Sequence, residues 1–368
     1  MGNSVSGTHI GGDVTGRDKL VQITNNYYGG AEGLSREVMR AASPQPLRVL
    51  AVIASPVAGL TDDAAAPGHL SGRAEWAKLR DAAKVAPLLL ARLRPPTAEA
   101  LRATLSPNRA GAFNIVHFIC HGAPGALALE DERGLTRVVP AAEIARAVGD
   151  GRIELVVVNA CYSAAGQAQS IAQALVDAGV RSVVAHRWPL IDQAAVVFSH
   201  VLYRELAAGR ALRAAFDEAV QTTTGRFDAE RGNAVLLGDA ALTFRRQDPV
   251  QPSQIIENAA LPDETARFFG RRVELLKLAD IFANEHVRGA ALTGIGGIGK
   301  SALAFEAADR HAWRFPGGVA YVRASEFGFS LDAALIDLAR SLGVADGGNA
   351  RRALLDYVNT TPCLLVLD

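Results

Sequence analysis

The sequence has 368 residues, with 38 basic and 38 acidic side chains, 49% hydrophobic residues and three cysteines. This balance of charge argues against a protein that binds nucleic acid or a membrane surface through bulk charge, and no apolar run reaches the roughly 18 residues that span a bilayer. An odd, small number of cysteines excludes a disulfide framework, and the chain begins without a signal-peptide pattern, so we expect a cytoplasmic protein of two or three domains.

The first segment, residues 1–33, is rich in Gly, Thr and Asn and places single β-branched residues between Ser-Gly, Gly-Gly and Thr-Gly pairs. This pattern predicts short strands separated by turns. Such a segment cannot close a core alone, and two interpretations stay open. One is a flexible tail, and the other is a self-associating β segment, which the low net charge and the absence of proline favour.

Residues 45–245 have a different sequence pattern, in which apolar runs alternate with stretches of helical periodicity. Continuous apolar runs indicate strands that are covered on both faces, hence a largely parallel sheet with crossover helices. The sequence therefore predicts a doubly wound, mostly parallel α/β domain. The predicted strands are 48–54, 85–91, 113–120, 153–159 and 182–186, and the predicted helices are 74–84, 97–105, 140–148 and 170–179.

Residues 246–264 contain three prolines among polar residues, and this composition predicts a linker. The apolar and helical patterns return after it. Residues 265–368 therefore predict a second α/β unit.

The clearest motif of the second unit is GIGGIGKS at residues 294–301, between a predicted strand and a predicted helix. It satisfies G-x-x-x-x-G-K-[ST], in which backbone N–H groups wrap a phosphate, Lys300 reaches the terminal phosphates and Ser301 binds Mg²⁺. The residues also match the dinucleotide pattern G-x-G-x-x-G, but Lys300-Ser301 directly after it favours a P-loop. The glycines of this predicted nucleotide site are Gly294, Gly296, Gly297 and Gly299.

The run PCLLVLD ends at Asp368 and predicts a further apolar strand. An acidic residue at the tip of such a strand, beside a phosphate loop, is where the Mg²⁺-orienting Walker B carboxylate lies. We therefore predict ATP or ADP with Mg²⁺ as the cofactor, and Ser301 and Asp368 at the metal. The pattern supplies only the first part of a P-loop domain, so hydrolysis of the nucleotide stays open.

The first unit offers a second candidate site. The run NIVHFICHGAPG predicts a strand that ends in His121-Gly122, and LVVVNACYSAAG predicts one that ends in Cys161. In a parallel sheet both tips lie on the carboxyl edge, where such folds place ligands. An imidazole beside a cysteine stabilises the thiolate and accepts its proton. A buried, inert cysteine is the competing interpretation, because free cysteine is among the most buried residue types.

Three segments in this order, VHFICHGAPG, LVVVNACYSA and GVRSVVAHRWPLIDQAAVVF, resemble the CHAT domain, a caspase-like peptidase module of bacterial proteins. The resemblance covers residues 45–245. It implies a caspase-like fold in which His121 is the proton acceptor and Cys161 the nucleophile, with no cofactor at the peptidase site. It also implies that the backbone N–H groups of Gly122 and Cys161 form the oxyanion hole.

Neighbouring side chains are predicted to have structural roles. Cys120 precedes the His-Gly pair, and because successive strand residues point to opposite faces, it should pack inward. Asp192 stands where it could cap a helix, and Asn159 where a side chain hydrogen-bonds at a strand end. A contribution of Trp188 or Asp192 to the substrate groove stays open.

The second unit is similar to the NB-ARC and related STAND nucleotide switches, on the segments FFGRRVELLKL and LTGIGGIGKSALA. This resemblance implies that Gly270 and Arg271 lie near the adenine and that nucleotide exchange drives a conformational change. Together, the two resemblances imply a cysteine endopeptidase coupled to an ATP-binding switch, as in bacterial immune-like effectors that oligomerise on a trigger. Its partners would be a protein or peptide substrate and other copies of the chain, with no nucleic acid or membrane.

Two alternatives are weighed against this interpretation. In the first, the CHAT-like domain is inactive and the protein is a nucleotide-binding signalling scaffold. In the second, the protein is an NTPase that acts on nucleic acid, which the zero net charge and the lack of a basic stripe disfavour.

Overall fold

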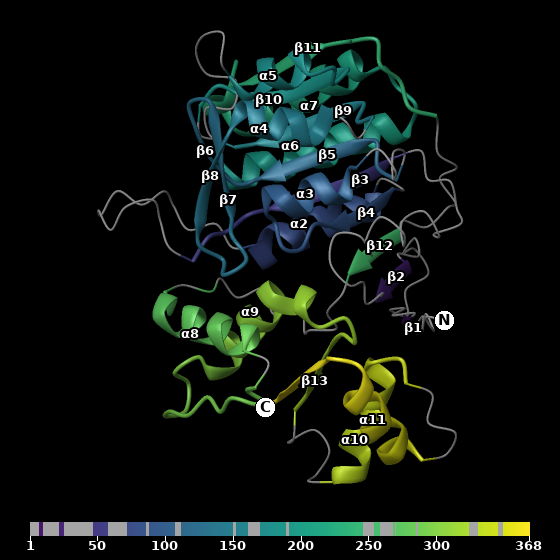
Figure 1. Cartoon of the computed structure of the whole chain (residues 1–368). Helices are drawn as coiled ribbons and strands as arrows, with labels where there is room; N and C mark the ends of the chain where they lie inside the picture. Colours follow the sequence, from purple (N-terminus) through teal and green to yellow (C-terminus); the bar gives the residue numbers. More distant parts are fainter. Residues whose placement is uncertain are drawn as a thin grey trace.

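The structure is a computed structural model. It shows a larger unit built on one sheet and a smaller C-terminal unit next to it (Figure 1). The described residues are 7–9, 22–25, 47–57, 72–85, 88–106, 112–149, 152–160, 170–188, 191–245, 254–257, 268, 270–284, 286–323, 330–344 and 349–368.

The larger unit contains a nine-stranded sheet with the order β1-β2-β12-β4-β3-β5-β9-β10-β11. The pairs β1–β2 and β10–β11 are antiparallel, and the other pairs of this sheet are parallel. The prediction of a mostly parallel sheet is therefore confirmed. Its strands are β1 Gly7–His9, β2 Gln22–Asn25, β3 Arg48–Ile53, β4 Leu89–Arg92, β5 Ile115–Ile119, β9 Leu155–Asn159, β10 Ser182–His186, β11 Ala234–Gly238 and β12 Gln254–Glu257.

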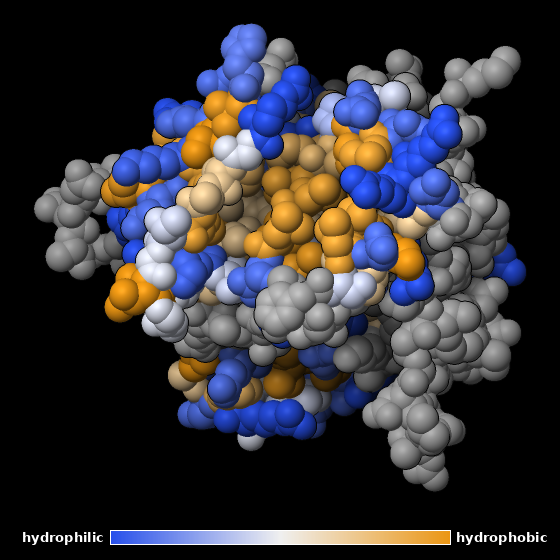
Figure 2. Space-filling view, turned by 90° about the horizontal axis from the view of Figure 1, so that it is seen from below, coloured by the Kyte–Doolittle hydropathy of each residue, from blue (hydrophilic) through white to orange (hydrophobic). Residues whose placement is uncertain are grey.

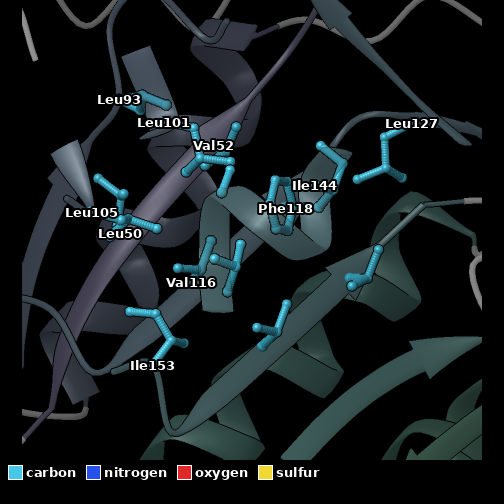
Figure 3. Packing of buried hydrophobic residues seen from close by; sticks show 14 of the residues in the cluster. Leu50, Val52, Leu93, Leu101, Leu105, Val116, Phe118, Leu127, Ile144 and Ile153 are labelled. Atoms are coloured by element: carbon cyan, nitrogen blue, oxygen red, sulfur yellow. The ribbon is translucent and has the colours of Figure 1, made fainter. Parts of the chain in front are cut away.

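Helices cover both faces of this sheet, and each face has its own apolar cluster. Helices α3, α4 and α5 pack on one face, where Phe118 lies among side chains from β3, α3 and α4 (Figure 3). Helices α2, α6 and α7 pack on the other face. Burial on two faces explains why the strands read as continuous apolar runs. The helices are α2 Gly72–Val85, α3 Ala98–Thr104, α4 Ala141–Gly149, α5 Ile171–Asp177, α6 Asp192–Ala207 and α7 Leu212–Arg226, followed by the short 3-10 helix η2 Asp228–Glu230.

One edge of the sheet is built from strands that lie far apart in the sequence. The predicted linker 246–264 contains β12, whose Ile255 and Ile256 are buried. Strand β12 pairs in parallel with both β4 and β2, so it joins the first segment of the chain to the sheet. The short strands predicted within residues 1–33 are present at β1 and β2, whereas self-association of that segment stays a prediction.

A small antiparallel sheet stands at the carboxyl end of β5 and was not predicted. It contains β6 His121–Ala123, β7 Ala126–Glu130 and β8 Thr136–Pro140. The turn between β6 and β7 is Pro124-Gly125, with Gly125 at φ 73°. Proline followed by a residue of positive φ suits a type II turn, which explains this tight hairpin.

The C-terminal unit contains a two-stranded parallel sheet, β13–β14, flanked by helices. The strand predicted before the P-loop is not formed. Residues 286–291 are exposed, and within the described chain no strand is assigned between α8 and α9. The elements are α8 Arg272–Ala283, α9 Lys300–His311, the 3-10 helix η3 Ala312–Arg314, β13 Val319–Val322, α10 Leu331–Ser341, α11 Ala350–Thr360 and β14 Leu364–Leu367.

Exposed large hydrophobic side chains are concentrated in the C-terminal unit. Figure 2 views the molecule from below and shows apolar side chains gathered in a hollow with a hydrophilic rim. Within the described chain, eight of the ten large hydrophobic side chains that are exposed belong to residues 273–367. None of the described helices combines the length and the apolar character needed to cross a bilayer.

Candidate active site and phosphate-binding loop

His121 stands where two sheets meet. Strand β5 ends at Ile119, and two residues later His121 opens β6, where it pairs with Ala128 of β7. The side chain of His121 is half-buried, as is Gly122, which pairs with Leu127. The backbone of both residues is thus paired with β7, directly after the chain leaves the main sheet.

Cys161 and residues 162–169 lie outside the described residues, but the strand that leads to Cys161 is described. Strand β9 is the parallel neighbour of β5, in a register that pairs Ile119 with Asn159. The register offset is forty positions (159 − 119), the same as the separation of His121 and Cys161. In the sequence, each of these two residues therefore follows the end of its strand by two positions.

Two buried histidines lie beneath this edge, on the face that α6 covers. His117 of β5 shares a hydrogen bond of 2.8 Å with the hydroxyl of Tyr203. Burial, with a smaller contribution from nearby His186, lowers the pKa of His117 to about 3. Burial also lowers the pKa of His186. Sequence reasoning missed this polar layer, although a histidine inside the apolar run IVHFI was a signal for it.

The end of β9 is tied to its neighbours by polar contacts. The Asn159 side-chain amide donates to the Ser199 hydroxyl of α6 at 3.4 Å. His186 donates from Nδ1 to the carbonyl of Val158 at 3.2 Å. The expected role of Asn159 as a strand-end hydrogen-bonding residue is confirmed, and the strand that leads to Cys161 is fixed up to its last residues.

The loop after β10 lies on the same edge and is held by buried polar side chains. The Asn233 carboxamide oxygen accepts the backbone N–H groups of Arg187 and Trp188 at 2.9 and 3.0 Å. The Glu230 carboxylate accepts the N–H of Ile191 and the amide of Asn233. This second polar cluster was also missed, because its members are separated by about forty residues in sequence and only the fold brings them together.

Two structural predictions near the dyad can be compared with the structure. Cys120 is buried in the cluster on the α3–α5 face, which confirms that it packs inward. Helix α6 begins at Asp192, and Ile191 occupies the N-cap position without a side-chain cap bond. The side chain of Asp192 is outside the described part of the structure.

The loop at residues 294–299 leads directly into α9. Gly294, Gly297 and Gly299 have φ of 154°, 75° and 91°, values that L side chains rarely adopt. A Cβ added at Gly296, Gly297 or Gly299 would meet no atom within 4 Å, so these three positions of the loop border open space. Gly299 is the N-cap of α9, so the first N–H groups of the helix point toward this loop.

The structure brings the other residues of the predicted nucleotide site to this loop. Lys300 donates to the carbonyls of Gly294 and Ile295, each at 3.1 Å. The Ser301 hydroxyl donates to the Asp368 carboxylate at 2.8 Å. A hydroxyl beside a carboxylate, at the start of a helix whose loop is open, is a donor set that suits Mg²⁺ with a phosphate.

The predicted Gly270-Arg271 pair also reaches the loop. Both residues have positive φ, 73° and 54°, and Arg271 donates to the carbonyl of Ile298 at 2.9 Å. Its guanidinium also pairs with Glu274 of α8 at 3.2 Å. Residues that are almost thirty positions apart in sequence thus meet at the phosphate loop.

Comparison with known families decides the assignment of the first unit. The sequence model of the CHAT domain matches residues 30–231, which is 202 of the 368 residues. The chain belongs to the CHAT domain family. The matched range contains both His121 and Cys161 and covers β3 to β10 of the larger unit, whereas β1, β2, β11 and β12 lie outside it. We use the name CHAT domain for the larger unit that contains this range.

Solved structures also resemble this chain. The crystal structure of the Arg specific cysteine proteinase gingipain R matches with a TM-score of 0.39 and 12% identity, over 55% of this chain and 48% of that chain. The complex of the Porphyromonas gingivalis RgpB pro- and mature domains gives 0.38 and 12%, over 55% and 49%. Pro-sf-caspase-1 gives 0.35 and 11%, over 54% and 90%. The chain thus spans about half the length of the gingipain chains. No curated protein sequence matches it.

Proposed function

We propose that the CHAT domain is a cysteine endopeptidase, with Cys161 as the nucleophile and His121 as the proton acceptor. The observation that carries this proposal is the β5–β9 register, which makes the two residues follow adjacent parallel strands at equal distance from their ends. Membership of the CHAT family supports the assignment. A histidine and a cysteine on one sheet edge form the pair that nucleophilic thiol catalysis needs.

The reaction follows from the chemistry of the two groups. His121 accepts the thiol proton, and the Cys161 sulfur attacks the carbonyl carbon of the scissile peptide. The C–N bond breaks as His121 returns the proton to the leaving amine, which leaves a thioester. Water then attacks the thioester, gives its proton to His121 and releases the acid and the thiol. The backbone N–H groups of Gly122 and Cys161 would stabilise the oxyanion in both steps.

We propose in addition that the C-terminal unit binds ATP or ADP with Mg²⁺. The loop amides at 294–299 and Lys300 would hold the phosphates, and Ser301 and Asp368 would hold the cation. Gly270 and Arg271 would lie at the nucleotide's base. The contact between Ser301 and Asp368 supports the proposal. Bound nucleotide supplies a terminal phosphate whose presence or loss can shift a conformational equilibrium.

The peptidase assignment is tested by incubating the full-length chain with a peptide library, beside Cys161→Ala and His121→Ala. We expect both variants to lose cleavage by a factor of roughly 10³ or more, because each removes a member of the dyad. Cys120→Ala is the matched control, since its thiol is buried in the core, and it should cleave like the wild type. Cleavage that survives Cys161→Ala would overturn the proposed mechanism, and a silent wild type would favour the scaffold alternative.

The nucleotide site is tested by calorimetric titration of Mg²⁺·ATP and Mg²⁺·ADP into the full chain. Lys300→Ala should weaken binding roughly tenfold to a hundredfold, because it removes a charged hydrogen-bond donor from the phosphates. Lys277→Ala, which removes an exposed lysine of α8, is the control of equal charge and should bind like the wild type. Equal affinity for Lys300→Ala and Lys277→Ala would contradict the assignment.

A further inference from the structure

The C-terminal unit docks on the carboxyl edge of the CHAT sheet, the edge that carries His121. Figure 1 shows α8 and α9 directly below the CHAT domain. Val57, which follows β3, packs in one apolar cluster with side chains of α8 and α9. These apolar contacts lie beside a much larger polar contact, which the end of α9 makes.

Arg310 of α9 is the centre of this polar contact, although it is only 7% exposed. Its Nη1 donates to the carbonyl of Ser55 at 2.6 Å, and its Nη2 to the Ser55 hydroxyl at 3.2 Å. Its Nε donates to Glu306 at 2.8 Å, and Nη1 lies 3.7 Å from the carboxylate of Glu130. The same Glu130 oxygen accepts the N–H of Ser55 at 2.6 Å. A single guanidinium thus joins α9 to β7 and to the segment that follows β3 in the CHAT domain.

Asp309, next to Arg310, makes the reciprocal contact. It pairs with Arg92, the last residue of β4, at 3.4 Å, and with Arg94, which follows that strand. Burial opposes the charge of Asp309, but the guanidinium groups of Arg92, Arg94 and Arg73 outweigh it and hold its pKa well below the usual range. The network balances three guanidinium groups, Arg92, Arg94 and Arg310, with three carboxylates, Glu130, Glu306 and Asp309.

Two short routes lead from this network to His121. Glu130 lies on β7, two residues from Ala128, which pairs with His121. Ser55 follows Ala54, whose N–H donates to the carbonyl of Ile119 at 3.0 Å, two residues before His121. Arg310 therefore contacts the end of β7, which pairs with the strand of His121, and the segment after β3, which bonds to the end of β5 just before His121.

We propose that Arg310 is a positioning residue for His121, and that through α9 it couples the phosphate loop to the dyad. This inference rests on the proposed function. Helix α9 has twelve residues, with the loop glycine Gly299 at its N-cap and Arg310 in its last turn. A continuous helix moves as one element, so a shift at the loop is transmitted to Arg310. Removing one partner from a buried ion pair is strongly destabilising, so a displacement of Arg310 affects every charged group of the network.

The first test measures exchange of backbone hydrogens in a full-length Cys161→Ala background, with and without Arg310→Gln. Because this background lacks the nucleophile, the result does not depend on peptide cleavage. Arg310→Gln should raise exchange in the β6–β7 hairpin and leave β9 and β10 unchanged, which also verifies that the sheet is folded. Mg²⁺·ATP should alter hairpin exchange when Arg310 is present and not when it is replaced. Hairpin exchange that is equal with and without Arg310 would overturn the proposal.

The second test separates positioning from a merely structural role. In the otherwise native chain, Arg310→Gln should lower kcat roughly tenfold to a hundredfold with little change in KM, because His121 is displaced while the substrate surface is kept. Compared with Arg310→Gln, Arg310→Lys should restore part of kcat, since lysine keeps the positive charge but lacks the planar set of N–H donors of the guanidinium. Arg133→Gln, which removes an exposed pair with Asp280 between the same units, is the control and should leave kcat unchanged. An unchanged kcat in Arg310→Gln would contradict positioning.

Discussion

The CHAT domain and the C-terminal unit are stabilised in different ways. The central strands of the CHAT sheet are almost fully buried between two helix layers. Strand β14 is only half-buried, and most exposed large hydrophobic side chains of the described chain belong to the C-terminal unit. The CHAT core is thus covered by helices on both faces, whereas the C-terminal unit leaves much of its apolar surface exposed even when it is docked on the CHAT edge.

Removing core volume from the CHAT sheet should have the largest effect. Phe118 is fully buried in the apolar cluster on the face of the sheet that α3, α4 and α5 cover (Figure 3). Phe118→Ala should lower the free energy of unfolding of the CHAT domain by about 3–5 kcal/mol, through lost burial and a residual cavity. Urea denaturation followed by circular dichroism measures the change. A loss below about 1 kcal/mol would show that this core is not as closely packed as the structure indicates.

Breaking the docked contact should come next. Asp309→Asn leaves Arg92 and Arg94 buried with less compensating charge and should destabilise the contact by about 3 kcal/mol. Arg133→Gln, at the exposed pair of the same interface, should cost at most about 1 kcal/mol. Limited proteolysis of the segment between the units, compared for both variants, reports the difference. Equal protection of the two variants would mean that the buried network does not hold the units together.

A smaller and more local effect is expected inside the C-terminal unit. Leu338 of α10 is 4% exposed and packs with β13 and α11, so Leu338→Ala should cost about 2–3 kcal/mol in that unit. Leu355→Ala removes a side chain that is 50% exposed and should cost roughly 0.5 kcal/mol or less. Hydrogen exchange resolves the two units separately. If Leu338→Ala raised exchange equally in β5 and β9, the units would unfold as one and the comparison would fail.

A gradual pH dependence of stability is expected from the buried His117, spread over more than three pH units. Burial lowers the pKa of His117 to about 3 in the folded protein, whereas an ordinary histidine has a pKa of 6.5. Above pH 6.5 the imidazole of His117 is neutral in both the folded and the unfolded protein. Between pH 6.5 and pH 3 it binds a proton only in the unfolded protein, so the free energy of unfolding falls as the pH drops through this range. The slope from His117 is about 1.4 kcal/mol per pH unit. His117→Asn should remove this contribution to the slope when the free energy of unfolding is measured by denaturation at several pH values in this range. An unchanged slope would contradict the burial of a neutral imidazole.

The sequence predicts those parts of the fold that local pattern determines. Apolar runs and helical periodicity were enough for β3, β5, β9 and β10 and the helices between them, because burial on two faces leaves a continuous signal. The placement of the tips of β5 and β9 on one edge followed from the parallel sheet, and so did the candidate dyad, whereas the direct pairing of the two strands is known from the structure. The inward-facing Cys120 followed from strand alternation.

Elements that depend on distant partners were not predicted. Strand β12 is four residues in a proline-rich segment, and it is a strand because β2 and β4 offer free edges on either side. The hairpin β6–β7 is too short for a pattern. The network around Arg310 joins positions more than two hundred residues apart, and no local pattern in α9 marks one buried arginine among its charged residues.

The central claim is that His121 activates Cys161, and the pH dependence of Cys161 alkylation tests it most directly. Iodoacetamide modification is followed by peptide mass spectrometry, with Cys120 and Cys363 as internal references in the same molecule. We predict that Cys161 reacts fastest and that its rate is already high below pH 7, whereas His121→Ala moves its profile to an ordinary thiol near pH 8.5. A Cys161 profile that is unchanged by His121→Ala would contradict the account.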